Sequence, residues 1–251
     1  FMGIGGADKN MGVRHIGVDE AGRGAAMGPL VVCALSIPKD DAGILKDLGV
    51  DDSKKLTKSK REEIHAEIIA ISDSSGWEIG LIQCDPKSID LWMNSGTLNS
   101  LEVKAFADAI SKVTPNSGEF NLFLDACDVD AERFGRNVTS SLGEGGGRCN
   151  VFSEHGMDSS DVVTGAASII AKVNRDWAME RLSKELGIDM GSGYPSDPKS
   201  KSAIEELCMK DIPNDCLRRK WKNVGREWMK HHGKPIPPRV VGAQSALDEW
   251  I

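Results

Sequence analysis

The sequence lacks a long apolar run, a paired-cysteine motif and an apolar leader. No segment approaches the ~18 consecutive apolar residues of a membrane-spanning helix. The Gly-rich start carries no apolar h-region of a secretory signal. The six cysteines include no CxxC pair, so their spacing favours reduced, buried thiols over a disulfide framework or a zinc site. We therefore expect a cytoplasmic protein.

Basic charge and aromatic residues are also scarce. The net charge is −7, aromatic residues make up 5% of the chain, and Tyr194 is the single tyrosine. Proteins that bind nucleic acid are usually basic, so such a function here would require a local basic cleft. The 251 residues, 40% of them hydrophobic, suit one large α/β domain or one domain with an appendage.

Segments typical of strands alternate with segments of helical period. Predicted strands cover residues 13–18, 30–35, 77–82, 121–124 and 150–152. Predicted helices cover residues 98–113, 131–142, 162–186, 198–209 and 217–229. A further helix begins after Thr57 or Ser59, and Ser59 with Glu62 fits a capping box. This order predicts an α/β fold with a mixed central sheet flanked by helices.

Isolated acids stand where predicted strands end. Asp19 and Glu20 follow the first strand, Asp125 follows the strand at 121–124, and Asp158 precedes the long helix. Strand ends converge at one edge of an α/β sheet, where ligands bind. Four carboxylates without ligating Cys or His spacing suit Mg²⁺ or Mn²⁺. Two such ions, ~4 Å apart, can clamp a phosphodiester during hydrolysis.

Each of these residues also has a structural interpretation. Asp19 and Glu20 could form a cap pair, and Asp125 competes with Asp128 and Asp130, which suit the start of the next helix. His155 could act as a general base, but a structural role is favoured because a metal can activate water directly.

Glycines surround a lone arginine in the segment Gly22-Arg23-Gly24. Glycine lets the backbone of a ligand approach closely, and an arginine suits a phosphate. Arg23 could also be an ordinary surface charge.

Five stretches, in this order, resemble the motifs of ribonuclease HII, the type 2 ribonuclease H. They are GVDEAGRG (17–24), DDSKKL (51–56), LFLDACDVDAERFG (122–135), EHGMDSSDVVTGAASIIAKVNRD (154–176) and GSGYPSDP (191–198). The fourth stretch and the DVDAERF phrase resemble archaeal members most. Because the five motifs span residues 17–198, the resemblance covers most of the chain.

The resemblance implies a ribonuclease H-like catalytic domain over 13–187 and a helical C-terminal part over 188–233. It implies divalent-metal-dependent hydrolysis of RNA in RNA/DNA hybrids. It also implies incision 5′ of a single ribonucleotide in duplex DNA, which gives 3′-hydroxyl and 5′-phosphate ends during replication and repair.

The resemblance also assigns roles to residues of this chain. The family's four catalytic, metal-binding acids fall on Asp19, Glu20, Asp125 and Asp158. The remaining matches concern the substrate: Gly22, Arg23 and Gly24 read the 2′-hydroxyl through backbone groups, Tyr194 packs on the sugar, and Ser53 and Lys54 hold the substrate backbone.

The fourth motif departs from the family pattern. Asp161-Val162 stands where the family usually has Tyr-Pro, and Gly165 replaces a common serine. Counting back from Ala166 keeps Asp158 in register as the catalytic acid, although Asp161 lies only three residues away. Two alternatives remain open: a related nuclease that acts on junctions or on hybrids only, and a non-catalytic binding module. The presence of all four acids argues against the module.

The two ends of the chain are expected to lie outside the folded part. Residues 1–12 are a Gly-rich lead-in, and 234–251 begin with a stiff, Pro-rich linker. The tail resembles the clamp-binding box of DNA-replication proteins through Gln244, Leu247, Trp250 and Ile251, although the last position is usually aromatic. Its expected partner is the DNA sliding clamp; the alternative is a frayed amphipathic end.

Overall fold

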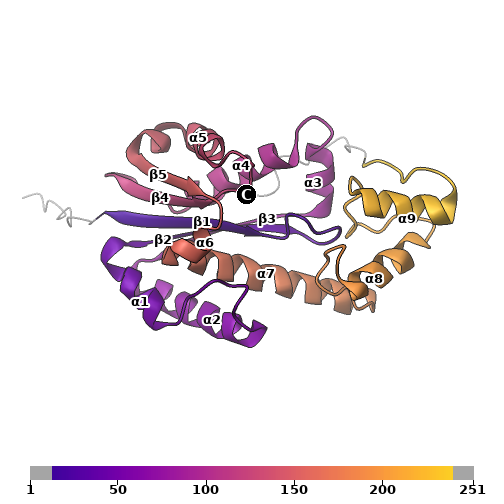
Figure 1. Ribbon diagram of the computed structural model, residues 1–251, viewed down its shortest axis with the longest axis horizontal. Helices are drawn as coiled ribbons and strands as arrows, with labels where there is room; N and C mark the ends of the chain where they lie inside the picture. The colour runs from indigo at the N-terminus through magenta and orange to yellow at the C-terminus, as the bar shows by residue number, and fades with distance from the viewer. Residues whose placement is uncertain (1–12, 240–251) are drawn as a thin grey trace, which may run out of the picture.

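A five-stranded sheet with helices on both faces forms the centre of the computed structural model, which describes residues 13–239 (Figure 1). The strands are β1 (Arg14–Ala21), β2 (Leu30–Pro38), β3 (Glu78–Cys84), β4 (Phe120–Asp125) and β5 (Cys149–Glu154). The α-helices are α1 (Ala42–Asp47), α2 (Lys58–Ser75), α3 (Pro86–Trp92), α4 (Leu98–Ser111), α5 (Ala131–Ser141), α6 (Met157–Ser160), α7 (Val162–Leu186), α8 (Pro198–Cys208) and α9 (Lys222–His232), with 3₁₀ turns η1 (Lys39–Asp41) and η2 (Gly143–Arg148).

The sheet is mixed, which confirms the predicted fold class. Its strand order is β3-β2-β1-β4-β5. β1, β2 and β3 are antiparallel neighbours, whereas β4 runs parallel to β1 and β5 runs parallel to β4. The last parallel pair of β1 and β4 is Val18 with Leu124. Asp19 follows Val18 and Asp125 follows Leu124, so the two acids lie side by side just beyond the last β1–β4 pair.

Side chains on β1 alternate between two helical layers. Ile16 and Val18 belong to the core under α4 and α5, and Ala21 belongs to the core under α2 and α7. Because neighbouring strand residues point to opposite faces, Asp19 faces α7 and Glu20 faces α4. The two adjacent acids therefore belong to different sides of the sheet.

Helix α7 lies directly on β1 because Gly17 has no side chain. A Cβ built at Gly17 would lie 2.3 Å from the backbone nitrogen of Thr164. In α7, a Cβ at Gly165 would lie 2.9 Å from the carbonyl oxygen of Asp158 in α6. Gly17 therefore lets α7 pack closely against β1, and Gly165 lets α6 pack closely against α7.

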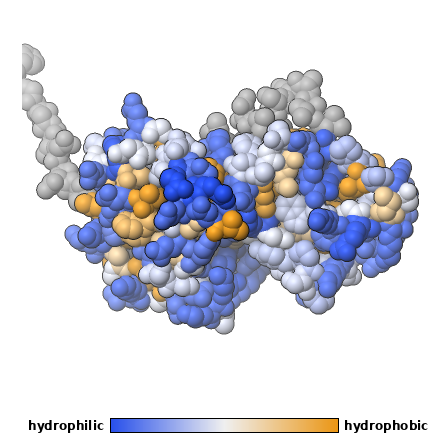
Figure 2. All heavy atoms as spheres, turned by 45° about the horizontal axis from the view of Figure 1, so that its top comes forward, coloured by the Kyte–Doolittle hydropathy of each residue, from blue (hydrophilic) through white to orange (hydrophobic). Residues whose placement is uncertain are grey.

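The C-terminal helices α8 and α9 share a third core with the β1–β2 connection. Ala26 and Met27 pack there with Met179 of α7 and the fully buried Trp228 of α9. Figure 2 shows that the surface is hollowed where the C-terminal helices meet the rest of the molecule. The β1–β2 connection is therefore packed between the sheet and the C-terminal helices.

Several predicted boundaries were wrong. β1 extends to Ala21 because β2 pairs with it as far as Val31, so the two acids lie in the strand. Thr57, one of the two predicted N-caps, caps α2 by accepting a hydrogen bond from the Lys60 backbone, whereas the predicted capping box of Ser59 and Glu62 does not start this helix.

The last predicted helix also starts too early. α9 begins at Lys222 and not at 217, because the chain before it pairs with the β1–β2 connection. Leu217 forms a β-bridge with Met27, and the Arg218 backbone donates to the carbonyl of Ala26.

Two further expectations concern the cysteines and the chain ends. All six cysteines are free, and Cys33, Cys84, Cys208 and Cys216 are buried, as predicted. No helix within residues 13–239 is long and apolar enough to cross a bilayer. The lead-in at 1–12 and the clamp-like residues Gln244, Leu247, Trp250 and Ile251 lie outside the described residues.

Candidate active site

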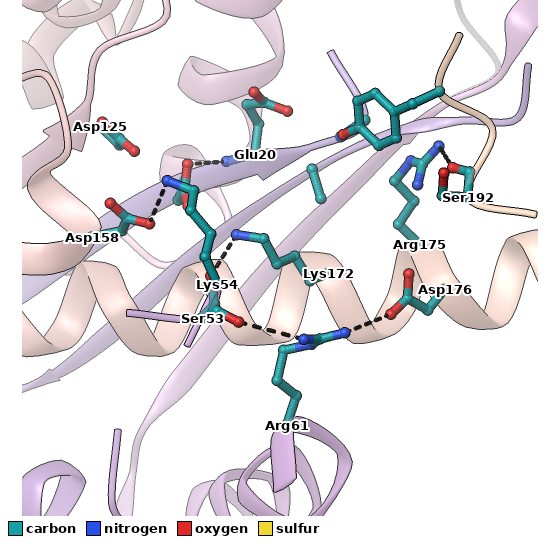
Figure 3. A pocket seen from close by; sticks show the side chains of 14 residues that line it. Glu20, Ser53, Lys54, Arg61, Asp125, Asp158, Lys172, Arg175, Asp176 and Ser192 are labelled. Atoms are coloured by element: carbon teal, nitrogen blue, oxygen red, sulfur yellow. Dashed lines mark hydrogen bonds and ion pairs between the residues drawn. The ribbon is translucent and has the colours of Figure 1, made fainter. Parts of the chain in front are cut away.

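A pocket of about 340 Å³ opens at the end of β1 where the acids gather (Figure 3). Its walls come from β1, from the loop before α2, from the ends of β4 and α6, and from α7. The loop that contains Ser192 and Tyr194 closes it from the C-terminal side. Six separate segments of the chain therefore meet at one place.

Three of the predicted acids form a compact cluster in this pocket. Oxygen atoms of Asp19, Asp125 and Asp158 lie within 4.8 Å of one another. Asp19 and Asp158 are only 5% and 4% exposed. Asp125 accepts backbone hydrogen bonds from Gly156 at 2.8 Å and Met157 at 3.3 Å, which fixes it against α6.

The cluster carries more negative charge than its surroundings neutralise. Burial, and then the charges of Asp125 and Glu20, raise the pKa of Asp19 to about 8. Burial and the charge of Asp158 also raise the pKa of Asp125. Buried Oδ2 of Asp158 receives no hydrogen bond from any described residue. Crowded, underpaired carboxylates favour a bound cation, and an all-oxygen donor set fits Mg²⁺ or Mn²⁺.

Glu20 lines the same pocket but lies apart from the other three acids. Its carboxylate accepts the Arg23 backbone N–H at 3.2 Å and groups with Glu102 and Cys127. Figure 3 shows it turned away from Asp125 and Asp158. Burial is the main cause that raises the pKa of Glu20. The strand alternation described above explains the separation.

Lysines and buried hydroxyls flank the cluster. Lys172 of α7 donates to Ser53 and, at 2.8 Å, to Ser168, and the two hydroxyls lie 3.0 Å apart. Lys54 lies 3.6 Å from Asp158 Oδ2, yet its side chain is 69% exposed. The resemblance assigned Ser53 and Lys54 to the substrate, and Lys172 lines the same pocket beside them.

The Gly22–Gly24 loop forms one wall, and Tyr194 lies against it. Gly22 has φ +100° and donates its backbone N–H to the Tyr194 hydroxyl at 3.1 Å. A Cβ at Gly24 would lie 3.7 Å from the Tyr194 ring, an ordinary contact. The guanidinium of Arg175 lies 4.9 Å from the centre of that ring. The predicted sugar-reading residues are therefore neighbours.

Arg23 is engaged within the protein. Its Nε lies 3.1 and 3.3 Å from the two carboxylate oxygens of Glu102, and it also donates to Asn99 at 2.6 Å. Glu102 is fully buried, and its pKa is raised to about 8, chiefly by burial. Glu102 was not predicted from the sequence. The sequence does contain a signal for it. Glu102 lies three residues before Ala105 and four before Phe106, which places an acid on the apolar face of α4.

A second missed residue, Arg218, holds the β1–β2 connection in place. It is fully buried and donates to the carbonyl oxygens of Gly28 at 3.0 Å and Arg23 at 3.1 Å. No pattern in the sequence signalled this role, because both acceptors are backbone groups far along the chain.

The alternative candidates for the catalytic acids and the general base have other contacts in the structure. Asp161 caps α7 by accepting the backbone and hydroxyl of Thr164, both at 2.8 Å, so Asp158 is the acid of this motif that joins the cluster. Asp130 caps α5, and Asp128 pairs with Arg133 at 2.6 Å. His155 is exposed and its Nδ1 lies 3.2 Å from the carbonyl of Ala126.

Comparisons with known proteins give the family of the chain. The family model of ribonuclease HII matches residues 16–224. Ribonuclease HII of Methanocella arvoryzae is 41% identical over 210 residues, covering 82% of this chain and 88% of that protein. Ribonuclease HII of Pyrococcus abyssi is 38% identical over 239 residues, covering 94% and 96%.

Solved structures show the same fold. The PCNA:RNase HII complex from Archaeoglobus fulgidus matches with TM-score 0.73 and 34% identity, covering 84% of this chain and 96% of that one. Ribonuclease H2 from Pyrococcus horikoshii matches with TM-score 0.77 and 34% identity, covering 88% and 100%. The chain therefore belongs to the ribonuclease HII family and is a ribonuclease, a hydrolase of phosphodiester bonds.

Proposed function

We propose that this chain hydrolyses the RNA strand of RNA/DNA hybrids and incises duplex DNA 5′ of a single embedded ribonucleotide. The products would carry 3′-hydroxyl and 5′-phosphate ends. Family membership supports an endoribonuclease that acts on RNA paired with DNA. The observation that carries the proposal is the cluster of Asp19, Asp125 and Asp158 beside a loop that can approach a sugar closely.

Enzymes of this family depend on metal, and the donor set here fits that need. Asp19, Asp125 and Asp158 would hold divalent cations, Mg²⁺ or Mn²⁺, with Glu20 at the margin of the pocket. Two bound cations would supply an activated water and a positive charge near the departing 3′ oxygen. The protein contributes carboxylates that are already gathered and largely shielded from water.

The other pocket residues would position the substrate. Lys172, restrained by Ser53 and Ser168, offers a fixed positive charge beside Asp19. Lys54 is exposed enough to follow the substrate backbone. The backbone of Gly22–Gly24 and the ring of Tyr194, which are in contact with each other, would together form the surface on which the ribose packs.

Cleavage assays on three matched duplexes test the proposal. One contains a full RNA strand, one a single ribonucleotide, and one only DNA; each is assayed with Mg²⁺ and with Mn²⁺. We expect cleavage of the first two, and none after Asp19→Asn or Asp125→Asn. Metal-dependent cleavage that persists in both variants would overturn the assignment of the acids. Cleavage of the hybrid alone would favour the hybrid-specific alternative.

A sliding clamp is the second proposed partner. The tail residues Gln244, Leu247, Trp250 and Ile251 resemble a clamp-binding box, and the Archaeoglobus fulgidus relative was solved as a complex with PCNA. An apolar plug of this kind would fit a hydrophobic pocket on a partner. The clamp would then bring the nuclease to replicating DNA.

Titration of purified sliding clamp against the full chain and a chain without residues 244–251 tests this partner. We expect the deletion to remove clamp binding while cleavage of a short duplex stays unchanged. Equal clamp affinity of the two chains would exclude the tail as the binding element.

A further inference from the structure

The chain after α9 folds back to α3 as a strap, residues 234–239 (Figure 1). Ile236 packs against the core that α8 and α9 share with the β1–β2 connection. The carbonyl oxygen of Pro237 accepts a hydrogen bond from Arg219 at 3.1 Å. Three of the six strap residues are prolines, which fix φ and stiffen the segment. The strap is therefore held in place although it forms no helix or strand.

Arg239 fastens the end of the strap. Its side chain is only 5% exposed. The guanidinium donates to the Asp90 carboxylate at 3.2 Å and to the carbonyl oxygens of Asp215 at 2.9 Å and Leu217 at 3.1 Å. It also pairs with the carboxylate of Asp215. Charge-assisted hydrogen bonds in several directions fix the position of an arginine.

Asp90 of α3 receives this arginine in the protein interior. It is 1% exposed, and it also accepts the backbone N–H groups of Arg219 at 2.9 Å and Lys220 at 3.0 Å. One carboxylate therefore joins α3, the chain before α9 and the end of the strap. Because breaking a buried ion pair is costly, the strap stays attached here, and we call Arg239 with Asp90 the anchor.

The anchor lies close in sequence to the clamp-like tail. Gln244 comes five residues after Arg239. A residue spans at most ~3.6 Å, so the clamp-like residues begin no more than ~18 Å from the anchor. Without the anchor, this length would be counted from Gly233 at the end of α9, and it would reach ~40 Å over eleven residues. The anchor thus more than halves the possible separation.

We propose that the anchor fixes the point from which the clamp-binding tail leaves the nuclease, and so keeps the acid pocket close to the DNA that a sliding clamp encircles. This inference rests on the proposed clamp partner, because only a bound tail gives the anchor this role. Arg239 does not line the acid pocket and acts as a positioning residue. If its contacts only stabilised the fold, chain length on either side of it would have no separate effect.

Trypsin tests the anchor without a clamp, because it cuts after an arginine whose side chain enters its specificity pocket. In the full chain we expect slow cutting of the bond after the buried Arg239, followed by the mass of released residues 240–251. Asp90→Asn should be cut there about tenfold faster, since cutting tracks the open population. The control Asp108→Asn alters a surface pair with Lys104 and should match the parent. Equal rates for Asp90→Asn and the parent would exclude the anchor.

Insertions on either side of Arg239 test the role of the anchor. Six Gly and Ser residues are inserted either before the strap, between 233 and 234, or after the anchor, between 240 and 241. The readout is the clamp-dependent gain, which is the ratio of kcat/KM with and without clamp. The substrate is a duplex with one ribonucleotide and blocked ends, so that a loaded clamp stays on it.

We expect only the insertion after the anchor to matter. It lengthens the chain between Arg239 and the clamp-like residues from five to eleven residues. The gain should then fall about threefold, because effective concentration falls with about the −3/2 power of linker length. The insertion before the strap should leave the gain at the parent value, because Arg239 still holds the end of the strap. Neither insertion changes a residue within 13–239.

Arg239→Ala should lower the gain about two- to threefold, since the tail is then held only through Pro237 or Gly233. The control is Arg136→Ala, which removes an exposed arginine paired with Glu132 on α5, and its gain should not change. Clamp affinity and cleavage without clamp should match the parent in both variants, because the tail and the acid pocket are unaltered.

Equal gains for the two insertions would contradict the inference, because a strap without an anchor makes the two positions equivalent. A parent chain that does not bind the clamp would instead defeat the proposed partner, and with it the role of the anchor. The trypsin assay would still show in that case whether the anchor itself exists, so the two failures are distinguishable.

Discussion

Three crowded carboxylates, two of them buried, are the central feature of the pocket at the residue scale. The oxygens of Asp19, Asp125 and Asp158 lie within 4.8 Å of one another, and like charges so close disfavour their joint ionisation. Lys54, 3.6 Å from Asp158, and Lys172, whose charge acts on Asp19, offset only part of this repulsion. We infer that the cost is tolerated there because a cation offsets it in the working enzyme.

Asp158 and Asp161 provide a matched test of that view. Asp158→Asn should lower cleavage by at least about 100-fold, the scale of a lost charge-stabilising group. It should also raise the metal-free thermal midpoint, because one repelling carboxylate is gone. Asp161→Asn keeps a good helix cap and should cleave normally. If Asp161→Asn alone were inactive, the register of this motif would have been assigned to the wrong acid.

Glu102 should act as a positioning residue through Arg23. Glu102→Gln keeps the shape of the side chain but removes the charge that Arg23 contacts at 3.1 Å. The pKa of Glu102 is raised to about 8, so the two proteins are compared at about pH 9, where the parent carboxylate is ionised. Because the pairing of the buried Glu102 with Arg23 is weakened, kcat/KM on the single-ribonucleotide duplex should fall about tenfold, the scale of 1.4 kcal/mol. Affinity for plain DNA should be unchanged.

Glu205→Gln is the control for this prediction, since Glu205 pairs with Lys230 on the surface, far from the pocket in sequence. Surface pairs contribute little, so this variant should behave as the parent enzyme. Equal kcat/KM values for the Glu102 and Glu205 variants would exclude a positioning role.

The sequence predicted the location of the acids better than their grouping. Strand ends and motif matches selected Asp19, Glu20, Asp125 and Asp158, and the structure gathers three of them. The separation of Glu20 follows from strand alternation once β1 is known to continue through both acids. The roles of Glu102 and Arg218 could not be predicted, because each depends on a partner that only the tertiary fold brings near.

At the scale of elements, the contact between α7 and β1 sets the geometry of the pocket. α7 carries Lys172 and Arg175, β1 carries Asp19, and Gly17 is the point where the two elements touch most closely. Any displacement of α7 therefore changes the distance between its cations and the acid cluster.

Gly17→Ala should destabilise the protein by about 2–3 kcal/mol, because overpacking forces backbone atoms apart. The added Cβ would meet the Thr164 backbone at 2.3 Å. Gly225→Ala in α9 is the control, since a Cβ there meets nothing within 4 Å; it should stabilise by about 0.5–1 kcal/mol. Urea unfolding of both variants measures the difference. A Gly17→Ala protein as stable as the parent would show that α7 shifts without cost.

Long helices were predicted from the sequence, whereas the shortest ones were not. The 25-residue helix α7 was predicted with its observed bounds, because its apolar pattern repeats over many turns. α1, α3 and α6 have six, seven and four residues, too few for a period to emerge. Asp158 lies in one of these short helices, so its burial had no local signal.

At the scale of the whole molecule, metal binding and folding should be linked. A ligand that binds only the folded state stabilises it by about 2.7 kcal/mol at 100 times its dissociation constant. We expect Mg²⁺ or Mn²⁺ to raise the thermal midpoint of the parent protein and a chelator to reverse the effect. Asp19→Asn should respond much less. Equal shifts in both proteins would mean that the ions bind elsewhere.

The anchoring of the β1–β2 connection by Arg218 has a consequence for biosynthesis. Its hydrogen bonds to Gly28 and Arg23 join residues 190 and 195 positions apart, and such distant contacts form late in folding. A nascent chain that has left the ribosome only as far as α7 already contains Asp19, Asp125 and Asp158. It lacks the residue that fixes the loop beside them, so the polypeptide contains the proposed metal ligands before the loop proposed to select a ribose can be anchored.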